Sequence, residues 1–232
     1  MPRKSLIRSS ELPYHVTNRS NNKEWFYIPI EEVWDIFSDT LTLCTERYQV
    51  IPYAFVLMSN HYHLIIATPL NNLDFMMRFF QTEVAKEIQR RAGRINHIFG
   101  NRYKWSLLWN ASATAYGYKY VLRNPVRAGL SECVENYPYS SINPTKIGSV
   151  PWACGVSKKW NLVPKDYSEQ LRWLNRQATN HLESLVSRGL RRVEFKFPQG
   201  NSDLRNLMAL EDEYGIPTAP ATFTAEKSIG TI

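Results

Sequence analysis

Residues 56–66 carry the feature that most restricts what this chain can become: two histidines, His61 and His63, in an otherwise apolar, β-prone run. Residues two apart on a strand point to the same face of its sheet. The two imidazoles therefore project together, with Tyr62 on the opposite side. Two imidazoles on one rigid strand can form half of a divalent-metal site. The alternative is a pair of ordinary strand histidines that face solvent or a polar partner.

The spacing of apolar residues predicts an α+β fold. Strands are expected at residues 12–19, 49–58 and 60–68 and within 98–109, and helices at 29–48 and 73–91. The order β-α-β-β-α-β is typical of a ferredoxin-like or RRM-like antiparallel sheet with helices on one face. An added helix is expected in the second half of residues 111–124, ending at Pro125. Another is expected at about residues 168–187.

Composition narrows the class of partner. The chain has 232 residues, 44% of them hydrophobic, and a formal charge of +7. A basic balance favours a polyanion, with nucleic acid first, although many proteins with other partners are mildly basic. The three cysteines, Cys44, Cys133 and Cys154, form no CxxC motif, which argues against a disulfide framework or a zinc knuckle. No signal peptide or membrane-length apolar run is present, so we expect a cytoplasmic protein.

Tyr120 and Asn124 are the second candidates for chemistry. Four residues apart on a helix, they share one face. A tyrosine hydroxyl can act as a covalent nucleophile, and an amide oxygen can bind Mg²⁺ or Mn²⁺. The alternative is that Tyr120 only packs in an aromatic cluster with Tyr116 and Tyr118.

Basic residues accompany the aromatic ones near the predicted fourth strand and the Tyr120 helix. Proteins that bind single strands stack bases on rings and place cations along phosphates. We expect DNA contacts from eight residues: Arg19, Arg102, Lys104, Lys119, Arg123, Arg127, Arg191 and Arg192. The alternative is a solvated charged surface.

Four motifs in this order resemble the REP-associated tyrosine transposases, which belong to the single-tyrosine HUH endonucleases. They are YHVTNR at residues 14–19, VLMSNHYHL at 56–64, NRYK at 101–104 and YVLRNPVRAGL at 120–130. The resemblance covers about residues 10 to 142. The short HxH motif is weak alone, whereas HxH followed by YxxxNPVxAGL is quite specific.

The resemblance implies a metal-dependent enzyme that cleaves and joins single-stranded DNA beside hairpins, often those of repetitive extragenic palindromes. In it, His61 and His63, with Asn124 as third ligand, would hold Mg²⁺ or Mn²⁺. Tyr120 would attack the scissile phosphate and give a 5′-phosphotyrosine and a free 3′-OH. Bacterial insertion-sequence relatives carry Gln four residues after the Tyr, so the shorter Asn124 leaves its role as a ligand open. Family members range from monomers to dimers.

Two hypotheses of different classes follow. The first is the tyrosine transposase, with residues 1–147 as its catalytic domain and residues 148–232 as an extension that adds DNA contacts or simply packs on the sheet. The second is a non-catalytic RRM-like module or a domesticated regulator that binds DNA hairpins. The joint presence of Tyr120, His61 and His63 favours the first, because a binding module needs none of them.

Overall fold

A five-stranded sheet forms the centre of the molecule. The computed structural model describes residues 5–143, 145, 150 and 162–197. The strand order is β2-β3-β1-β4-β5, in which the first four strands pair antiparallel and β5 runs parallel to β4. The strands are β1 Tyr14–Arg19, β2 Ile51–Leu57, β3 His61–Ala67, β4 Lys104–Leu108 and β5 Glu194–Phe195. With the helices between them, the first four strands confirm the predicted α+β class and the β-α-β-β-α-β order.

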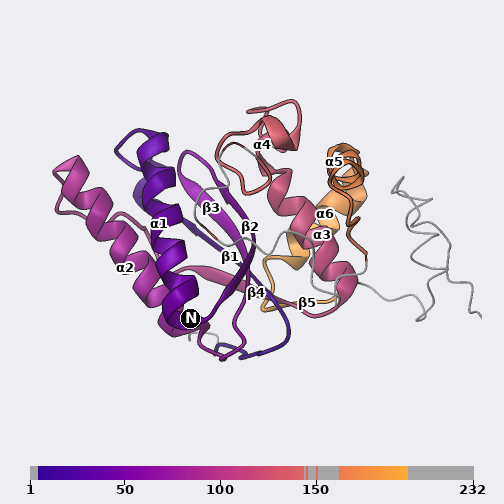
Figure 1. The fold of residues 1–232 in the computed structure, drawn as a ribbon, viewed down its shortest axis with the longest axis horizontal. Coiled ribbons are helices and arrows are strands. Elements are labelled where there is room, and N and C mark those ends of the chain that lie inside the picture. The colour runs from indigo at the N-terminus through magenta and orange to yellow at the C-terminus, as the bar shows by residue number, and fades with distance from the viewer. Residues whose placement is uncertain (1–4, 144, 146–149, 151–161, 198–232) are drawn as a thin grey trace, which may run out of the picture.

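Helices cover both faces of this sheet. Figure 1 shows α1 and α2 on one side and α3, α5 and α6 on the other. The α-helices are α1 Ile30–Tyr48, α2 Leu73–Ala92, α3 Ala111–Leu122, α4 Asn124–Arg127, α5 Tyr167–Asn175 and α6 Asn180–Gly189. Two short 3-10 helices are η1 Asn21–Lys23 and η2 Val134–Asn136. The third to sixth α-helices thus enclose the sheet face that the β-α-β-β-α-β unit itself leaves open.

Side chains along β3 point alternately to the two faces of the sheet. Tyr62 is fully buried and lies edge-on to Phe37 of α1 and Phe80 of α2, with ring centroids 5.3 and 5.9 Å apart. Such edge-to-face geometry is favoured by the aromatic quadrupoles. Since neighbouring residues on a strand alternate, His61 and His63 face the side of α3.

The helix that carries Tyr120 begins earlier than the sequence pattern indicated. The side chain of Asn110 accepts a hydrogen bond from the Ala113 backbone N–H, which caps the helix at its start. The helix ends at Leu122, and Pro125 lies in the first turn of the short α4, where its missing N–H is not needed. The expectation that only the second half of residues 111–124 is helical was therefore wrong.

The predicted helix at residues 168–187 is also wrong, because it is two helices. The chain leaves helical conformation at Arg176, and Thr179 caps α6 by accepting from the Leu182 N–H. After α6, strand β5 extends the sheet beyond β4, with the Trp109 N–H donating to the Phe195 carbonyl. The sequence pattern did not predict this strand.

Part of the C-terminal region lies outside the described residues, including residues 198–232 and the proposed boundary at 147/148. That boundary stays a prediction, although α6 and β5 show that residues well beyond it join the same fold. In the described part of the chain, no helix combines the length and the apolar character needed to cross a bilayer. The cytoplasmic location stays a prediction.

Gly189, at the end of α6, gives a test of how α6 and β5 fit together. A Cβ at this position would stand 2.2 Å from a ring carbon of the buried Phe195. We expect Gly189→Ala to lower the free energy of unfolding by about 1–3 kcal/mol, the usual effect of overpacking. Chemical denaturation measures the change. Ser184→Ala, at an exposed position of the same helix, is the control, and equal stabilities of the two variants would contradict this packing.

Candidate active site

The two histidines of the HxH motif lie together on the α3 face of the sheet. Their ring centroids are 5.2 Å apart, and the ring planes meet at 81°. Across the β1–β3 pairing, His61 stands opposite Arg19 and His63 opposite Thr17. The exposed Arg19 therefore marks the open end of the site, whereas His63 is 8% exposed.

A neighbouring amide sets the proton position on His61. The Asn60 Nδ2 donates to the Lys23 carbonyl at 2.8 Å, which turns Oδ1 of the same amide toward the His61 ring. This Oδ1 lies 2.7 Å from His61 Nδ1. Since an amide oxygen only accepts, Nδ1 carries the proton and Nε2 keeps its lone pair. The lone pair of His61 is thus on Nε2, the nitrogen that the predicted metal site would use.

A third histidine, His15 within the YHVTNR motif, lies at the site, although it was not predicted as a site residue. His15 of β1 is buried, and its Nε2 lies 2.9 Å from His63 Nδ1. The two rings are nearly parallel, with centroids 5.1 Å apart. The available signal was the alternation of β1, which places His15 on the same face as Thr17 and Arg19.

Burial keeps these imidazoles neutral. It lowers the pKa of His15 to about 4. It also lowers the pKa of His61 to about 4, with Arg19 adding to the effect. The pKa of His63 is held well below its usual value, first by burial and then by the charges of its neighbours. At neutral pH the site therefore presents uncharged imidazoles, the form that binds metals.

Helix α3 brings Tyr120 to the histidines. The Tyr120 and His63 rings meet edge-on, with centroids 6.1 Å apart. The Arg127 guanidinium lies 4.7 Å from the Tyr120 ring centroid, and its Nε donates to Glu183 of α6 at 3.0 Å. The structure thus unites the predicted nucleophile, the two histidines and one predicted DNA-binding cation.

Asn124 lies one helical turn after Tyr120, with its amide turned toward the helix. Its Nδ2 donates to the Tyr120 carbonyl at 2.8 Å and to the Val121 carbonyl at 3.3 Å. Oδ1 is then the only atom of this side chain that can accept or ligate. Within the described ranges, no group of three or more His, Cys, Asp or Glu side chains is arranged to hold a metal ion. Asn124 Oδ1 as a third ligand stays a prediction.

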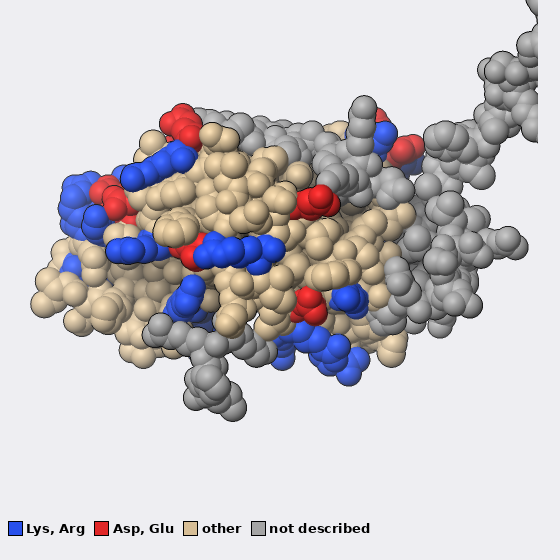
Figure 2. Space-filling view, turned by 90° about the horizontal axis from the view of Figure 1, so that it is seen from below, with Lys and Arg blue, Asp and Glu red and all other residues tan. Residues whose placement is uncertain are grey.

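The predicted DNA-binding cations do not form one group. Exposed side chains are those of Arg19, Arg102, Lys104, Arg127, Arg191 and Arg192. Lys104 stands opposite Thr17 in the β1–β4 pairing, and so it shares the histidine face. The face in Figure 2 also shows Lys and Arg side chains interspersed with Asp and Glu, without one continuous basic patch. The charges of Arg19 and Arg127 act on His63, whose pKa they help to lower, and Lys104 lies on the same sheet face.

Two of the predicted cations, Lys119 and Arg123, are buried instead. Lys119 Nζ donates to the Trp173 carbonyl at 2.6 Å, and Arg123 Nη1 donates to the Leu174 and Asn175 carbonyls at 2.8 and 2.9 Å. Burial lowers the pKa of Lys119 to about 7. In this conformation both residues hold the C-terminal end of α5 and offer no charge to a phosphate.

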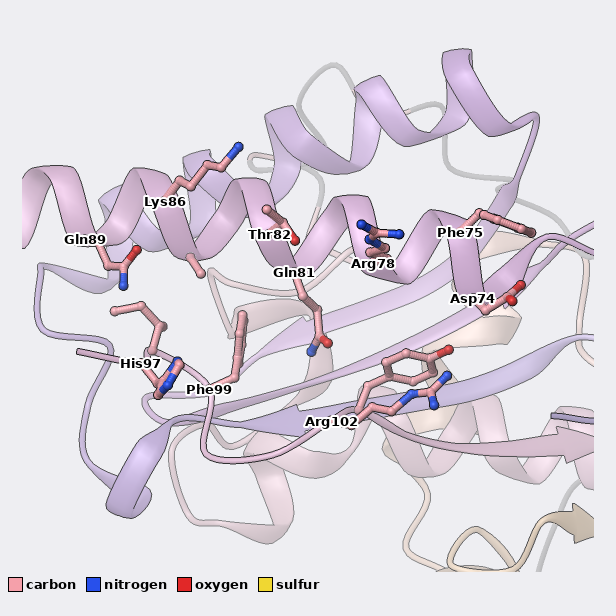
Figure 3. A pocket seen from close by; sticks show the side chains of 13 residues that line it. Asp74, Phe75, Arg78, Gln81, Thr82, Lys86, Gln89, His97, Phe99 and Arg102 are labelled. Carbon is pink, nitrogen blue, oxygen red and sulfur yellow. The ribbon is translucent and has the colours of Figure 1, made fainter. Parts of the chain in front are cut away.

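A groove of about 660 Å³ lies between α2 and residues 97–103. Figure 3 shows Gln81 directed from α2 into the groove, which Arg78 and Arg102 also line. Gln81 Nε2 donates to the Tyr62 hydroxyl at 3.3 Å, so the groove meets β3 on the face opposite the histidines. Arg102 therefore belongs to this second surface, whose rim carries the exposed Phe75.

Comparison with known proteins points to one family. A curated protein of Haemophilus influenzae, which carries the provisional name REP-associated tyrosine transposase, is 24% identical over 109 residues. This chain is similar to a REP-associated tyrosine transposase. The similarity confirms the resemblance that the motifs indicated. The match covers 42% of this chain and 62% of the relative's length. No protein-family model matches the chain.

Two solved structures are similar to parts of this chain. The structure of a REP-associated tyrosine transposase bound to a REP hairpin covers 61% of this chain and 81% of that chain, with a TM-score of 0.49 and 17% identity. A provisionally named transposase from Deinococcus radiodurans R1 covers 45% of this chain and 82% of that chain, with a TM-score of 0.35 and 16% identity. The fold class rests on the strand order and pairing described above.

The buried Arg123 gives a test of how the C-terminal helices are attached. Arg123→Met removes the donor to the last carbonyls of α5, each a charge-assisted hydrogen bond. We expect a loss of about 2 kcal/mol in the stability of that attachment and faster amide hydrogen exchange in α5. Arg172→Met, on an exposed side chain of α5, is the control. Equal exchange in both variants would show that Arg123 does not hold this helix.

Proposed function

We propose that this chain is a transposase that cleaves and joins single-stranded DNA beside hairpins through a covalent bond to Tyr120. The observation that carries the proposal is the meeting of Tyr120 with His63 on the sheet face that also presents His61. A packed aromatic would not need two neutral imidazoles beside it. The similarity to a REP-associated tyrosine transposase supports a palindromic hairpin as the substrate.

In the proposed reaction the Tyr120 hydroxyl oxygen attacks the phosphorus of the scissile phosphodiester. A tyrosine–phosphorus bond forms and the bond from phosphorus to the 3′ oxygen breaks, while the phenolic proton leaves to solvent and the departing 3′ oxygen takes up a proton from solvent. The products are a 5′-phosphotyrosine and a DNA end with a 3′-OH. Because the phosphodiester energy is conserved in the covalent bond, a 3′-OH can attack the intermediate and join strands without ATP. Arg127, next to the Tyr120 ring, is placed to favour the negative charge that develops there.

The side chains fit a divalent metal such as Mg²⁺ or Mn²⁺ in part. His61 offers Nε2, since its Nδ1 is bound to Asn60. His63 has its Nδ1 against His15, so it can offer only Nε2. Asn124 Oδ1 is the oxygen proposed as the third ligand. When bound, the metal would polarise and orient the scissile phosphate.

DNA would meet the chain at two surfaces. Arg19, Lys104 and Arg127 surround the histidine face and are proposed to hold the strand to be cut. Arg102 lies in the groove on the opposite face, where Arg78 adds a second cation and Phe75 an exposed ring. Cations track phosphates, and rings accept stacked bases. Arg191 and Arg192, exposed between α6 and β5, are proposed as further contacts.

Tyr120→Phe tests the proposed chemistry. Wild-type protein mixed with hairpin-bearing single-stranded DNA and Mn²⁺ is expected to give a protein–DNA adduct that survives denaturation. Tyr120→Phe should abolish the adduct while leaving hairpin binding within a few-fold, since only the attacking oxygen is removed. Gel shift under denaturing and native conditions measures both quantities.

Controls for this experiment are Tyr116→Phe and Tyr118→Phe, which remove hydroxyls from the same helix. A nick that persists in Tyr120→Phe would move the nucleophile to one of these two tyrosines. Hairpin binding without any adduct in wild-type protein, across a panel of hairpins, would support the non-catalytic binding module instead.

Arg102→Ala tests the groove as a DNA contact. Loss of one phosphate contact should weaken binding similarly for all sequences and reduce the slope of log affinity against log salt by about 1. Fluorescence anisotropy at several salt concentrations gives the slope. Lys165→Ala, an exposed cation elsewhere, is the control. An unchanged slope in Arg102→Ala would remove the groove from the DNA-binding surface.

A further inference from the structure

Three side chains form a row across the sheet under the proposed metal site: Ser106 of β4, His15 of β1 and His63 of β3. Ser106 stands directly opposite His15 in the β1–β4 pairing. His15 in turn contacts His63, Nε2 to Nδ1, at 2.9 Å. Ser106 is fully buried and His15 is 3% exposed. Both side chains are therefore removed from bulk solvent, where polar groups are usually satisfied by neighbouring protein atoms.

The contact between the histidines can hold one proton in either of two ways. If His15 Nε2–H donates, then His63 Nδ1 accepts, and the proton of His63 lies on Nε2. The lone pair that faces the site is then lost. If His63 Nδ1–H donates to His15 Nε2, then His63 Nε2 keeps its lone pair. Only the second arrangement lets His63 bind a metal, and it requires the proton of His15 on Nδ1.

Two buried atoms lack a partner at the far end of this row. Neither His15 Nδ1 nor Ser106 Oγ has a hydrogen-bond partner among the described residues. A buried polar atom without a partner is costly, by about 1–3 kcal/mol. Residues directly opposite on antiparallel strands have Cβ atoms about 4.5–5.5 Å apart. Rotation of the Ser106 side chain about its Cα–Cβ bond would therefore bring Oγ to accept from His15 Nδ1–H.

We propose that His15 is a positioning residue, which accepts the Nδ1–H of His63 and so fixes His63 in its metal-binding tautomer, with Ser106 as the partner of His15 Nδ1. This inference rests on the proposed function, because it assumes a metal at His61 and His63. The two ligands are then held by different means. His61 is oriented from its own loop by Asn60, and His63 is oriented from the neighbouring strand by His15. Groups that orient metal-binding histidines typically change metal affinity 10- to 100-fold when removed.

The test uses the full chain and Mn²⁺ alone, followed by electron paramagnetic resonance of the free ion. His15→Phe keeps a flat ring but removes the acceptor, and we expect about 10- to 100-fold weaker Mn²⁺ binding. In His15→Gln the amide oxygen can still accept from His63, and binding should stay within a few-fold of wild type. Ser106→Ala should weaken binding less than His15→Phe. His61→Ala provides the reference for a lost ligand.

The tautomer itself is measured without metal. Long-range ¹H–¹⁵N correlation spectra of the five histidines, assigned through the variants, should show the His63 proton on Nδ1 in wild type. Loss of this signature in His15→Phe, with its recovery in His15→Gln, would separate positioning from a general loss of packing. Thermal unfolding monitors the fold of each variant, and the wild-type spectrum stands even if His15→Phe does not fold.

The outcomes are distinct. Wild-type Mn²⁺ binding that His15→Phe leaves unchanged, or a His63 proton found on Nε2, would overturn the positioning role and leave the proposed function standing. Wild-type protein that binds no Mn²⁺ would overturn the metal site and the positioning role together. The Tyr120 adduct is scored separately. Weak binding in His15→Phe with the tautomer shift supports the proposal.

Discussion

Strand β3 connects the packing of this molecule to its chemistry, because its alternate side chains serve opposite faces of the sheet. Tyr62 packs against Phe37 and Phe80 in the layer of α1 and α2. A one-residue slip in register would send Tyr62 into the site and the histidines into the aromatic core. The core that stabilises the sheet therefore also fixes His61 and His63 toward α3, and the candidate site depends on that register.

The same sheet buries the site's histidines enough to keep them neutral. Burial lowers the pKa of His15 and His61 to about 4. At neutral pH, protons therefore do not compete with a metal ion for these rings. Positive charge is kept at the margin, where Arg19 and Arg127 are exposed. A phosphate would thus meet cations at the edge and uncharged imidazoles at the centre, an arrangement suited to holding an anion beside a metal.

How much of the structure the sequence could predict depends on how far apart along the chain the interacting residues lie. The first four strands, α1 and α2 were predicted because each depends on a local apolar period, and the HxH pair because it lies within one strand. The row of His15 and Ser106 escaped notice, since it appears only when three strands are brought side by side. Lys119 and Arg123 looked like surface cations because nothing local indicates that α5 covers them. The break between α5 and α6 required recognition of the Thr179 cap.

The C-terminal helices have a place in the proposed chemistry through the helix that they cover. Arg123 attaches α5 to the end of α3, and Glu183 of α6 holds Arg127 above the Tyr120 ring. An unattached arginine side chain loses much rotamer freedom when it is ordered, an entropic term opposing the contact with Tyr120. Because Glu183 of α6 already orders Arg127 before substrate binds, this loss of side-chain entropy does not add to the barrier of the proposed reaction. Residues beyond the motif-bearing region therefore reach the candidate active site through Arg127, besides the DNA contacts proposed for Arg191 and Arg192.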